Sequence, residues 1–403
     1  MISPGPQPVI TPITRPKRIT ILGATGTIGQ NTIDLLRQHK DRFRVTALTG
    51  GRNVQKLAEL ALELQPKWAV IEDQSEYETL KTLLAGTSIE AAAGADAITD
   101  IATEQTDIVI SGIVGVAGLA PTLAALRQGT TVGLANKECL VCAGELMIKE
   151  AERHNATLLP VDSEHNALFQ ILDGRSMEGI QNVTLTASGG PFRTWTTEQM
   201  ARATPEQAIA HPNWRMGAKI SVDSATMMNK GLELIEAHYL FGFSSAQLNV
   251  VVHPESIVHA MVSYRDGASL AALSLPDMRV PIAAALSWPE RLQNSTAALD
   301  LAALGTLTFE APDLQRFPAL SLARSVLETG GSIPAILNTA NEVVVDAFIN
   351  QSIRFSDIIS VIKEVLNRSN CVPIKSIDHL IEITEETRKQ TSSIIQGDHA
   401  WKH

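Results

Sequence analysis

The chain has 403 residues, which is too many for one ordinary domain and enough for two or three. Hydrophobic residues make up 44% of the sequence and charged residues 19%, as expected for a globular protein with a sizeable core. The formal net charge of −10 argues against nucleic acid or an anionic membrane as a partner, because both require a basic patch.

The N-terminal segment and the cysteines indicate where the protein works. Residues 1–16 contain five prolines and no apolar stretch of the signal-peptide kind, and no apolar run reaches the ~18 residues of a membrane span. We therefore expect a flexible leader on a cytoplasmic protein. Cys139 and Cys142 form a lone CxxC, so a four-ligand zinc site is not predicted, and reduced thiols near a helix start are the simpler interpretation.

Residues 17–161 alternate short apolar runs with amphipathic stretches. This alternation predicts a Rossmann-like α/β domain with a parallel sheet covered on both faces. The expected strands are 18–22, 44–48, 68–71, 107–110, 131–134 and 157–161, and the expected helices are 31–39, 54–64, 119–128 and 143–154.

The pattern changes after Val161. Residues 162–287 predict an α+β catalytic domain, residues 288–313 a linker and residues 314–403 a C-terminal helical domain. A long loop, 189–217, has no periodicity of its own, and we expect it to be a lid that closes over a substrate. Within these regions the expected strands are 182–186, 248–252, 258–264 and 269–275, and the expected helices are 321–329, 333–350, 355–366 and 377–390.

The first expected strand leads directly into a glycine motif and then a helix. Gly23, Gly26 and Gly29 would let the backbone turn tightly and approach a pyrophosphate, and the helix N-terminus would offer free N–H groups. The spacing is GxxGxxG, a variant of the dinucleotide fingerprint that is often seen with NADP. The alternative is a plain turn between a strand and a helix.

The end of the second expected strand indicates which dinucleotide is bound. An NAD enzyme usually has an acidic residue here, whereas this chain has Arg52 and Asn53 and no acid between residues 47 and 53. A guanidinium suits a 2′-phosphate, so NADPH is favoured over NADH. A solvated arginine at a loop tip is the alternative.

Two carboxylates follow the last expected strand of the first domain. In an extended chain, residues i and i+2 point the same way, so Asp162 and Glu164 would project to one side at the carboxyl end of the sheet. Two hard oxygen ligands suit Mg²⁺ or Mn²⁺. An exposed acidic turn would explain the same residues.

A second polar cluster lies further along the chain. Asp223 or Ser224 could cap a helix, and Asn229, Lys230 and Glu233 would then share one helical face. These residue types suit a phosphate, hydroxyl groups and a metal. A solvated face with a Lys–Glu pair is the alternative.

Seven motifs carry a family resemblance from residue 18 to about residue 400. They are GATGTIG (23–29), ANKE (135–138), LPVDSEHN (159–166), ASGGPFR (187–193), HPNWRMG (211–217), KISVDSATMMNKGLE (219–233) and HPESIVH (253–259). In these motifs the chain resembles the 1-deoxy-D-xylulose 5-phosphate reductoisomerases. The resemblance implies a homodimer that converts this phosphorylated deoxysugar to 2-C-methyl-D-erythritol 4-phosphate, with NADPH and Mn²⁺, Mg²⁺ or Co²⁺, in non-mevalonate isoprenoid biosynthesis.

The resemblance also assigns roles to particular residues. The metal ligands would be Asp162, Glu164 and Glu233. The substrate contacts would be Lys137, Ser163, Glu164, Ser188, His211, Ser224, Asn229, Lys230 and Glu233. The NADPH contacts would be Thr25, Gly26, Thr27, Ile28, Gly51, Arg52, Asn53, Asn136, Glu138 and Gly217.

Among these residues, Lys137 and His211 are expected to act in catalysis beside the three metal ligands. Lys137 is a candidate proton shuttle, and His211 is expected to bond substrate rather than metal because the oxygen set is already complete. The chain departs from the family at Arg52, where many members have lysine, and at Cys139, where serine is common.

Two other functions are compatible with the cofactor motif alone. A semialdehyde dehydrogenase would need a catalytic cysteine in the second domain, but none lies between residues 163 and 370. A non-enzymatic dinucleotide sensor would explain the glycine motif but not the density of polar residues from 162 to 259.

Overall fold

The computed structural model describes residues 15–214 and 216–397. The predicted leader lies outside these residues except for Arg15 and Pro16. Arg215 of the predicted lid and the last six residues of the predicted C-terminal domain also lie outside them.

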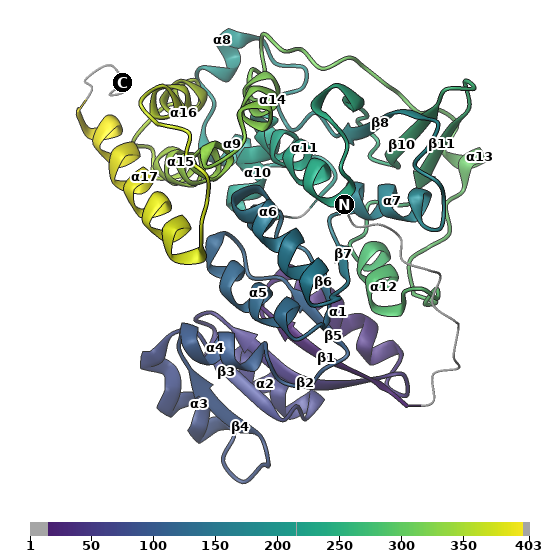
Figure 1. The fold of residues 1–403 in the computed structure, drawn as a ribbon, viewed down its shortest axis with the longest axis vertical. Helices are drawn as coiled ribbons and strands as arrows, with labels where there is room; N and C mark the ends of the chain where they lie inside the picture. The colour runs from purple at the N-terminus through teal and green to yellow at the C-terminus, as the bar shows by residue number, and fades with distance from the viewer. Residues whose placement is uncertain (1–14, 215, 398–403) are drawn as a thin grey trace.

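The N-terminal part is a seven-stranded parallel sheet with helices on both faces (Figure 1). The strand order is β4-β3-β2-β1-β5-β6-β7, so the chain reverses direction across the sheet between β1 and β5. Open sheets bind ligands at the carboxyl ends of the strands beside such a reversal. The strands are β1 (Lys17–Leu22), β2 (Phe43–Gly50), β3 (Trp68–Ile71), β4 (Glu90–Ala93), β5 (Ile108–Ser111), β6 (Thr131–Leu134) and β7 (Leu158–Pro160). The helices are α1 (Thr27–Gln38), α2 (Val54–Leu64), α3 (Tyr77–Leu83), α4 (Ala95–Ile101), α5 (Leu119–Arg127) and α6 (Lys137–Arg153).

Alternating side chains fill two cores on the two faces of this sheet. Ile19 and Ile21 of β1 face one core, while Leu22 faces the other, and all three are fully buried. A strand buried on both faces is a continuous apolar run, which is why the sequence predicts six of the seven strands to within two residues. β4 was missed because its sequence, Glu-Ala-Ala-Ala, is poor in strand-forming residues.

Two helices begin earlier than the sequence predicts, and both changes bring motif residues to a helix N-terminus. α1 begins at Thr27 rather than at residue 31, and α6 begins at Lys137 rather than at residue 143. α6 is kinked at Ala143, whose φ of −136° is not helical. The kink interrupts the helical periodicity, and this explains why the sequence predicts a start of α6 at residue 143.

The middle of the chain forms a mixed four-stranded sheet with the order β11-β10-β8-β9. β8 pairs with β9 in parallel and with β10 in antiparallel, and β11 is the edge strand beside β10. The elements of this region are α7 (Ser163–Leu172), β8 (Ile180–Ala187), α8 (Thr197–Met200), α9 (Pro205–Ile209), α10 (Ala218–Ala225), α11 (Met228–Phe241), β9 (Leu248–Val252), β10 (Val258–Tyr264), β11 (Ser269–Leu273), α12 (Arg279–Ser287) and α13 (Leu301–Leu304).

The expectation of an unstructured loop at 189–217 was wrong in part. The short helices α8 and α9 lie inside it, and each begins with a capping box, Thr196 with Gln199 and Thr204 with Gln207. In this motif the threonine and the glutamine satisfy each other's free backbone N–H groups, which stabilises helices too short to show a periodicity.

The C-terminal region consists of helices, as predicted, and lies on the upper left in Figure 1. It contains α14 (Ala319–Thr329), α15 (Ile333–Ile349), α16 (Asp357–Asn367) and α17 (Ile377–Gly397). α14 packs on α11, and α15 packs on α6 and α10, so this region supports the helices that end near the site. Among the described residues, no helix is both long and apolar enough to cross a membrane.

Candidate active site

The glycine motif forms the connection between β1 and α1. Gly23 has a φ of +85°, which favours glycine, and its N–H donates to Thr49 Oγ1 at 2.9 Å. A Cβ on Gly29 would lie 2.5 Å from Ala24 Cα, so this position has no room for a side chain. Gly26 precedes α1 without a side-chain cap, and a Cβ there would meet nothing closer than 3.5 Å. The first N–H groups of α1 are therefore open to an anion, and Gly26 and Thr27 are exposed.

The second half of the predicted cofactor site adjoins this motif. A Cβ on Gly50 would lie 3.2 Å from Thr25 Cγ2, so the end of β2 and the glycine motif are neighbours. Arg52 and Asn53 follow and are exposed, and the Asn53 side chain caps α2 by accepting from the Lys56 N–H at 3.0 Å. Ile28 and Gly51 are half-buried between these exposed residues.

The loop after β5, which was not predicted to belong to the site, is part of this edge. It runs from Gly112 to Gly118, and its Val114 is 81% exposed. The Asn136 side chain caps α6 and donates to the carbonyls of Ile113 and Gly115, which fixes the loop against α6. Three glycines in seven residues after a strand were the signal that could have identified it.

Three carboxylates converge where β7 ends. Asp162, Glu164 and Glu233 each offer an oxygen, and these oxygens lie within 4.8 Å of one another. Glu233 is 1% exposed and comes from α11, although it is far from the other two in sequence. The structure therefore brings together the three residues predicted as metal ligands, and oxygen donors in this arrangement fit Mg²⁺ or Mn²⁺.

The local geometry differs from the prediction at two points, and it also excludes one alternative. Asp162 and Glu164 are not in an extended chain, because Asp162 caps α7 and accepts from the Glu164 N–H at 3.2 Å. Neither Asp223 nor Ser224 caps α11, because they belong to a separate helix, α10, and Met227 precedes α11 with a φ of +62°. The solvated Lys–Glu face is also excluded, since Lys230 is only 4% exposed.

Two lysine ammonium groups pair with the carboxylates. Lys137 Nζ lies 2.6 Å from Asp162 and 2.8 Å from Glu233, and it donates to Asn229 Oδ1 at 2.9 Å. Lys230 Nζ contacts Glu233 and lies 3.7 Å from Glu164. Three carboxylates therefore face two ammonium groups, and buried carboxylates of this kind need such partners.

The pKa values reflect this pairing. Burial alone would lower the pKa of Lys137, but the negative charges of Asp162 and Glu233 outweigh it and hold the pKa well above its usual range. Burial would raise the pKa of Asp162, but Lys137 and His165 bring it well below its usual range. Burial and the neighbouring charge of Asp162 raise the pKa of Glu233.

A buried histidine and a buried glutamate, neither of them predicted as a site residue, lie behind the carboxylates. His165 Nδ1 lies 3.1 Å from Asp162 and 3.2 Å from Glu236, and Nε2 lies 2.9 Å from the Glu233 carbonyl. Burial lowers the pKa of His165, but Glu236 and Asp162 raise it to about 9, and burial raises the pKa of Glu236 to about 8. Glu236 lies one helical turn from Glu233, so the spacing of three residues on α11 was the available signal.

Ser188 and His211 meet at the edge of the predicted lid. Ser188 Oγ lies 2.9 Å from His211 Nε2. His211 Nδ1 accepts from the N–H groups of Asn213 and Trp214 at 3.2 and 3.0 Å, so Nε2 carries the proton. Burial lowers the pKa of His211 to about 4, and the ring is therefore neutral. His211 is not among the residues of the carboxylate group.

The remaining predicted substrate contacts surround these groups. Ser163 Oγ donates to Glu164 Oε2 at 2.9 Å, and Asn229 Nδ2 donates to Glu233 Oε1 at 2.6 Å. Ser224 adjoins the loop after β8, because a Cβ on Gly190 would lie 2.6 Å from the Ser224 carbonyl.

The two tryptophans of the predicted lid differ. Trp195 is half-buried, packs on Phe192 with ring centroids 4.5 Å apart and lies against the hydrophobic core, so core packing accounts for it. Trp214 is half-buried and follows His211.

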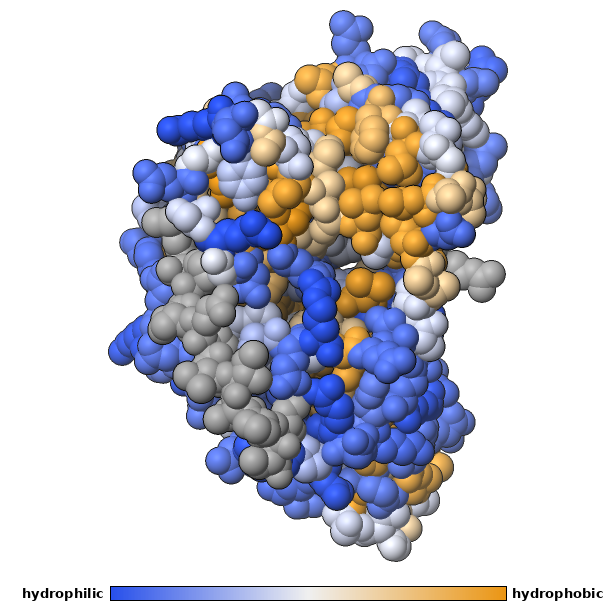
Figure 2. Space-filling view, turned by 90° about the vertical axis from the view of Figure 1, so that its right-hand side faces the viewer, coloured by the Kyte–Doolittle hydropathy of each residue, from blue (hydrophilic) through white to orange (hydrophobic). Residues whose placement is uncertain are grey.

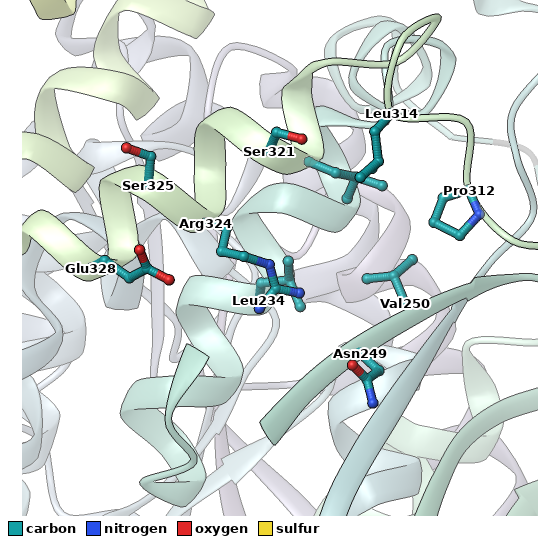
Figure 3. A pocket seen from close by; sticks show the side chains of 10 residues that line it. Leu234, Asn249, Val250, Pro312, Leu314, Ser321, Arg324, Ser325 and Glu328 are labelled. Carbon is teal, nitrogen blue, oxygen red and sulfur yellow. The ribbon is translucent and has the colours of Figure 1, made fainter. Parts of the chain in front are cut away.

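A separate hollow adjoins the other side of α11. It has a volume of about 340 Å³ and lies between α11, β9 and α14 (Figure 3). Arg324 borders it and is already bonded to the carbonyl groups of Ser245 and Leu248. None of the predicted site residues lines this hollow.

These features define a class of protein. A doubly wound sheet with an open helix N-terminus after β1, beside converging carboxylates at the end of β7, is typical of a pyridine-nucleotide-dependent oxidoreductase with a divalent metal site.

Comparisons with known proteins identify the family. Sequence profiles of 1-deoxy-D-xylulose 5-phosphate reductoisomerase match residues 19–144, those of its C-terminal domain match residues 158–241, and those of the DXP reductoisomerase C-terminal domain match residues 273–390. The reductoisomerase of Rhodospirillum centenum is 52% identical over 379 residues, which are 94% of this chain and 94% of the relative. That of Caulobacter vibrioides is 51% identical over 385 residues, which are 96% of this chain and 95% of the relative.

Solved structures agree with this result. The reductoisomerase from Zymomonas mobilis in complex with NADPH is similar with a TM-score of 0.91 and 47% identity, covering 95% of this chain and 100% of that one. A DOX-P reductoisomerase in complex with NADPH, fosmidomycin and magnesium has a TM-score of 0.89 and 42% identity, with the same coverage. The chain belongs to the 1-deoxy-D-xylulose 5-phosphate reductoisomerase family.

Proposed function

We propose that this chain converts 1-deoxy-D-xylulose 5-phosphate to 2-C-methyl-D-erythritol 4-phosphate with NADPH, at the residues described above. The reaction rearranges the carbon skeleton and then reduces the resulting aldehyde, in the non-mevalonate route to isoprenoid precursors. The observation that carries the proposal is the convergence of Asp162, Glu164 and Glu233 beside the Lys137 ammonium.

Asp162, Glu164 and Glu233 would hold the divalent cation, Mg²⁺, Mn²⁺ or Co²⁺. Their oxygens are hard donors that lie within 4.8 Å of one another, and Glu233 is 1% exposed. When bound, the cation supplies Lewis-acid stabilisation of negative charge on substrate oxygens, and NADPH supplies the hydride. His165 and Glu236 would orient Asp162 from behind, since both are fully buried and His165 bonds to it.

NADPH would lie along the carboxyl edge of the first sheet. Its pyrophosphate would bind at the uncapped N-terminus of α1, and Arg52 would contact the 2′-phosphate. The residues proposed to contact it are Thr25, Gly26, Thr27, Ile28, Gly51, Arg52, Asn53, Asn136, Glu138 and Gly217.

The sugar phosphate would bind between the carboxylates and the lid. Ser188, Ser224, Asn229 and Lys230 would hold the phosphate, and His211 would donate from Nε2 to a substrate oxygen. Ser163 would contact the sugar beside Glu164. Binding of the non-reacting phosphate holds the fragments of the rearranging skeleton in place.

Lys137 and the lid complete the proposed catalyst. The Lys137 ammonium lies among the carboxylates, where it would donate a proton to, or stabilise charge on, a substrate hydroxyl oxygen. The segment that carries His211 and Trp214 would close over the sugar and exclude water.

The proposed division of the chain follows from these roles. Residues 17–161 would bind NADPH, residues 162–287 would hold the metal and sugar with a lid at 189–217, residues 288–313 would link, and residues 314–403 would support the site. The three cysteines are free thiols, which suits a cytoplasmic enzyme.

We infer that the enzyme is a homodimer that associates through the second sheet. β11 is an edge strand, and its Leu270 and Leu273 are 36% and 38% exposed. Figure 2 views the side on which β10 and β11 lie in Figure 1, and it shows a broad apolar area over the upper part of the molecule. A contiguous apolar patch next to a free strand edge favours association.

The proposal is tested by the loss of NADPH absorbance when the purified full-length chain receives 1-deoxy-D-xylulose 5-phosphate and Mn²⁺. We expect turnover that stops when a chelator is added and returns with excess Mn²⁺. Turnover that persists in chelator, or an enzyme that consumes NADPH without the sugar phosphate, would contradict the proposal.

A further inference from the structure

A chain of polar contacts links the C-terminal helices to the cofactor side of the site. Lys219 Nζ lies 2.9 Å from Glu138 Oε1 and 2.9 Å from Asp223 Oδ2. Asn341 Nδ2, from α15, donates to the other Asp223 oxygen at 2.7 Å. These three residues, Lys219, Asp223 and Asn341, form a relay that ends at Glu138 in the first turn of α6.

The relay is buried where it crosses between helices. Asp223 is 1% exposed and Asn341 is fully buried. A buried carboxylate is costly unless it is paired, and Asp223 uses one oxygen for Lys219 and the other for Asn341. The conformation of Lys219 therefore depends on a residue of the C-terminal helices.

Lys219 lies between two segments that the cofactor would touch. Gly217, the last residue of the lid, is the N-cap residue of α10, and Lys219 is in the first turn of that helix. Glu138 follows Lys137, whose ammonium reaches the carboxylates. The Lys219–Glu138 ion pair thus ties the C-terminal base of the lid to the N-terminus of α6.

We propose that Lys219 is a positioning residue, oriented by Asp223 and Asn341, that holds Glu138 and Gly217 in place for NADPH. This inference rests on the proposed cofactor contacts of Glu138 and Gly217. It gives the C-terminal helices a defined part in cofactor binding, through Asn341, in addition to support of the fold.

The test is direct titration of NADPH, followed by its fluorescence, on the full-length protein without sugar phosphate. We expect Lys219→Met to raise the Kd for NADPH about fivefold or more, and Asn341→Ser to raise it in the same direction by less. The double variant should bind about as weakly as Lys219→Met alone, because both changes break one relay. Lys219→Arg should recover most of the affinity, since it keeps the charge.

Lys149→Met is the matched control, because Lys149 pairs with Glu145 on the exposed end of the same α6 helix. It should leave the Kd for NADPH unchanged. In steady state, the KM for NADPH should rise in Lys219→Met while the KM for the sugar phosphate stays within about twofold, a split that loss of folded protein would not produce.

A folded Lys219→Met protein with the wild-type Kd for NADPH overturns the inference, even if its melting temperature falls. Should Lys219→Met not fold, the Asn341→Ser titration decides, and an unchanged Kd overturns the inference. Failure of the proposed function is seen separately, because the wild-type enzyme itself would then not consume NADPH with the sugar phosphate.

Discussion

The Lys137 ammonium donates a hydrogen bond of 2.8 Å to Glu233, a residue 96 positions further along the chain. Lys137 is in the first turn of α6 and Glu233 is in α11, and these two helices pack against each other. The same ammonium reaches Asp162 at the end of β7. One lysine therefore joins the edge of the first sheet to the helix that carries the most deeply buried carboxylate.

Glu233→Gln should abolish most of the activity. A neutral amide is a weaker ligand for a hard cation, and it leaves Lys137 and Lys230 with one fewer carboxylate partner. We expect kcat/KM to fall roughly 100-fold or more, with a higher Mn²⁺ concentration needed for half-maximal rate. Glu145→Gln, at a glutamate whose side chain is 69% exposed, is the control and should retain wild-type kinetics. Near-normal turnover of Glu233→Gln at low Mn²⁺ would show that the three-carboxylate site is wrong.

Removal of divalent cations should stop the reaction without unfolding the protein. Lys137 and Lys230 already pair with the three carboxylates, so the site does not depend on a metal for its charge balance in the folded chain. We expect a cooperative thermal transition in chelator and a higher melting temperature as Mn²⁺ is added, because binding to the folded state stabilises it. If the protein in chelator showed no cooperative thermal transition, Lys137 and Lys230 would not be sufficient to stabilise the carboxylates without a metal.

Two glycines of the cofactor motif should respond differently to alanine. A Cβ on Gly29 would lie 2.5 Å from Ala24 Cα and from the Gly23 carbonyl, so Gly29→Ala should lower the melting temperature. Gly26 has space for a Cβ, and Gly26→Ala should leave the melting temperature within a degree or two while weakening NADPH binding about tenfold or more. Thermal melts and NADPH titrations of both variants separate the effects. Wild-type affinity in Gly26→Ala would argue against a pyrophosphate at this turn.

Replacing Arg52 should change the choice of dinucleotide. Arg52 is exposed after β2, where a guanidinium can contact a 2′-phosphate. Arg52→Gln should raise the KM for NADPH about tenfold and leave the KM for NADH nearly unchanged, whereas Arg52→Lys should keep most of the preference. The exposed Arg44 of β2 supplies the control, Arg44→Gln. The assignment fails if wild-type enzyme uses NADH and NADPH with equal kcat/KM.

The pH dependence of stability should report the burial of His211. Burial lowers the pKa of His211 to about 4. Between about pH 4 and pH 6.5 the imidazole is therefore neutral in the folded protein, whereas it gains a proton in the unfolded chain. The contribution of His211 to the free energy of unfolding is therefore complete above pH 6.5 and is lost as the pH falls towards 4.

His211→Gln removes this contribution. It should be about 1 kcal/mol less stable than wild type at pH 7, because hydrogen bonds are lost, and this deficit should shrink by pH 5. Urea unfolding at several pH values measures both quantities, with His154→Gln as the control at a partly exposed histidine. A deficit that grows on acidification has the opposite sign and would exclude a neutral, buried ring.

Much of the fold could be predicted because its strands are buried on both faces. Runs such as residues 68–71 and 131–134 match β3 and β6 to the residue, since a short, mostly buried run of this length favours a strand over a helix. β4 could not be predicted, because three alanines carry no periodicity and little strand preference. The capping threonines at 196 and 204 were visible in the sequence and would have predicted α8 and α9.

The candidate site was predicted in composition but not in geometry. Asp162 and Glu164 do lie together, but at the start of a helix, because the Asp162 side chain caps that helix. The break between α10 and α11 depends on the left-handed backbone conformation of Met227. Methionine rarely adopts this conformation, so the sequence does not indicate the break. Nor could sequence periodicity place Glu236 beside His165, since that contact joins α11 to α7 in the folded chain.

α12 has a consequence for how the chain must be synthesised. Its Ile282 and Leu286 are fully buried in the same core as Ile33 and Val161, and Lys17 bonds to the Leu286 carbonyl. One face of the first sheet is thus covered by α12, which is synthesised more than one hundred residues after β7, the last strand of that sheet. A fragment that stops at residue 161 would expose this apolar face, and a nascent chain must keep it from aggregating until α12 emerges.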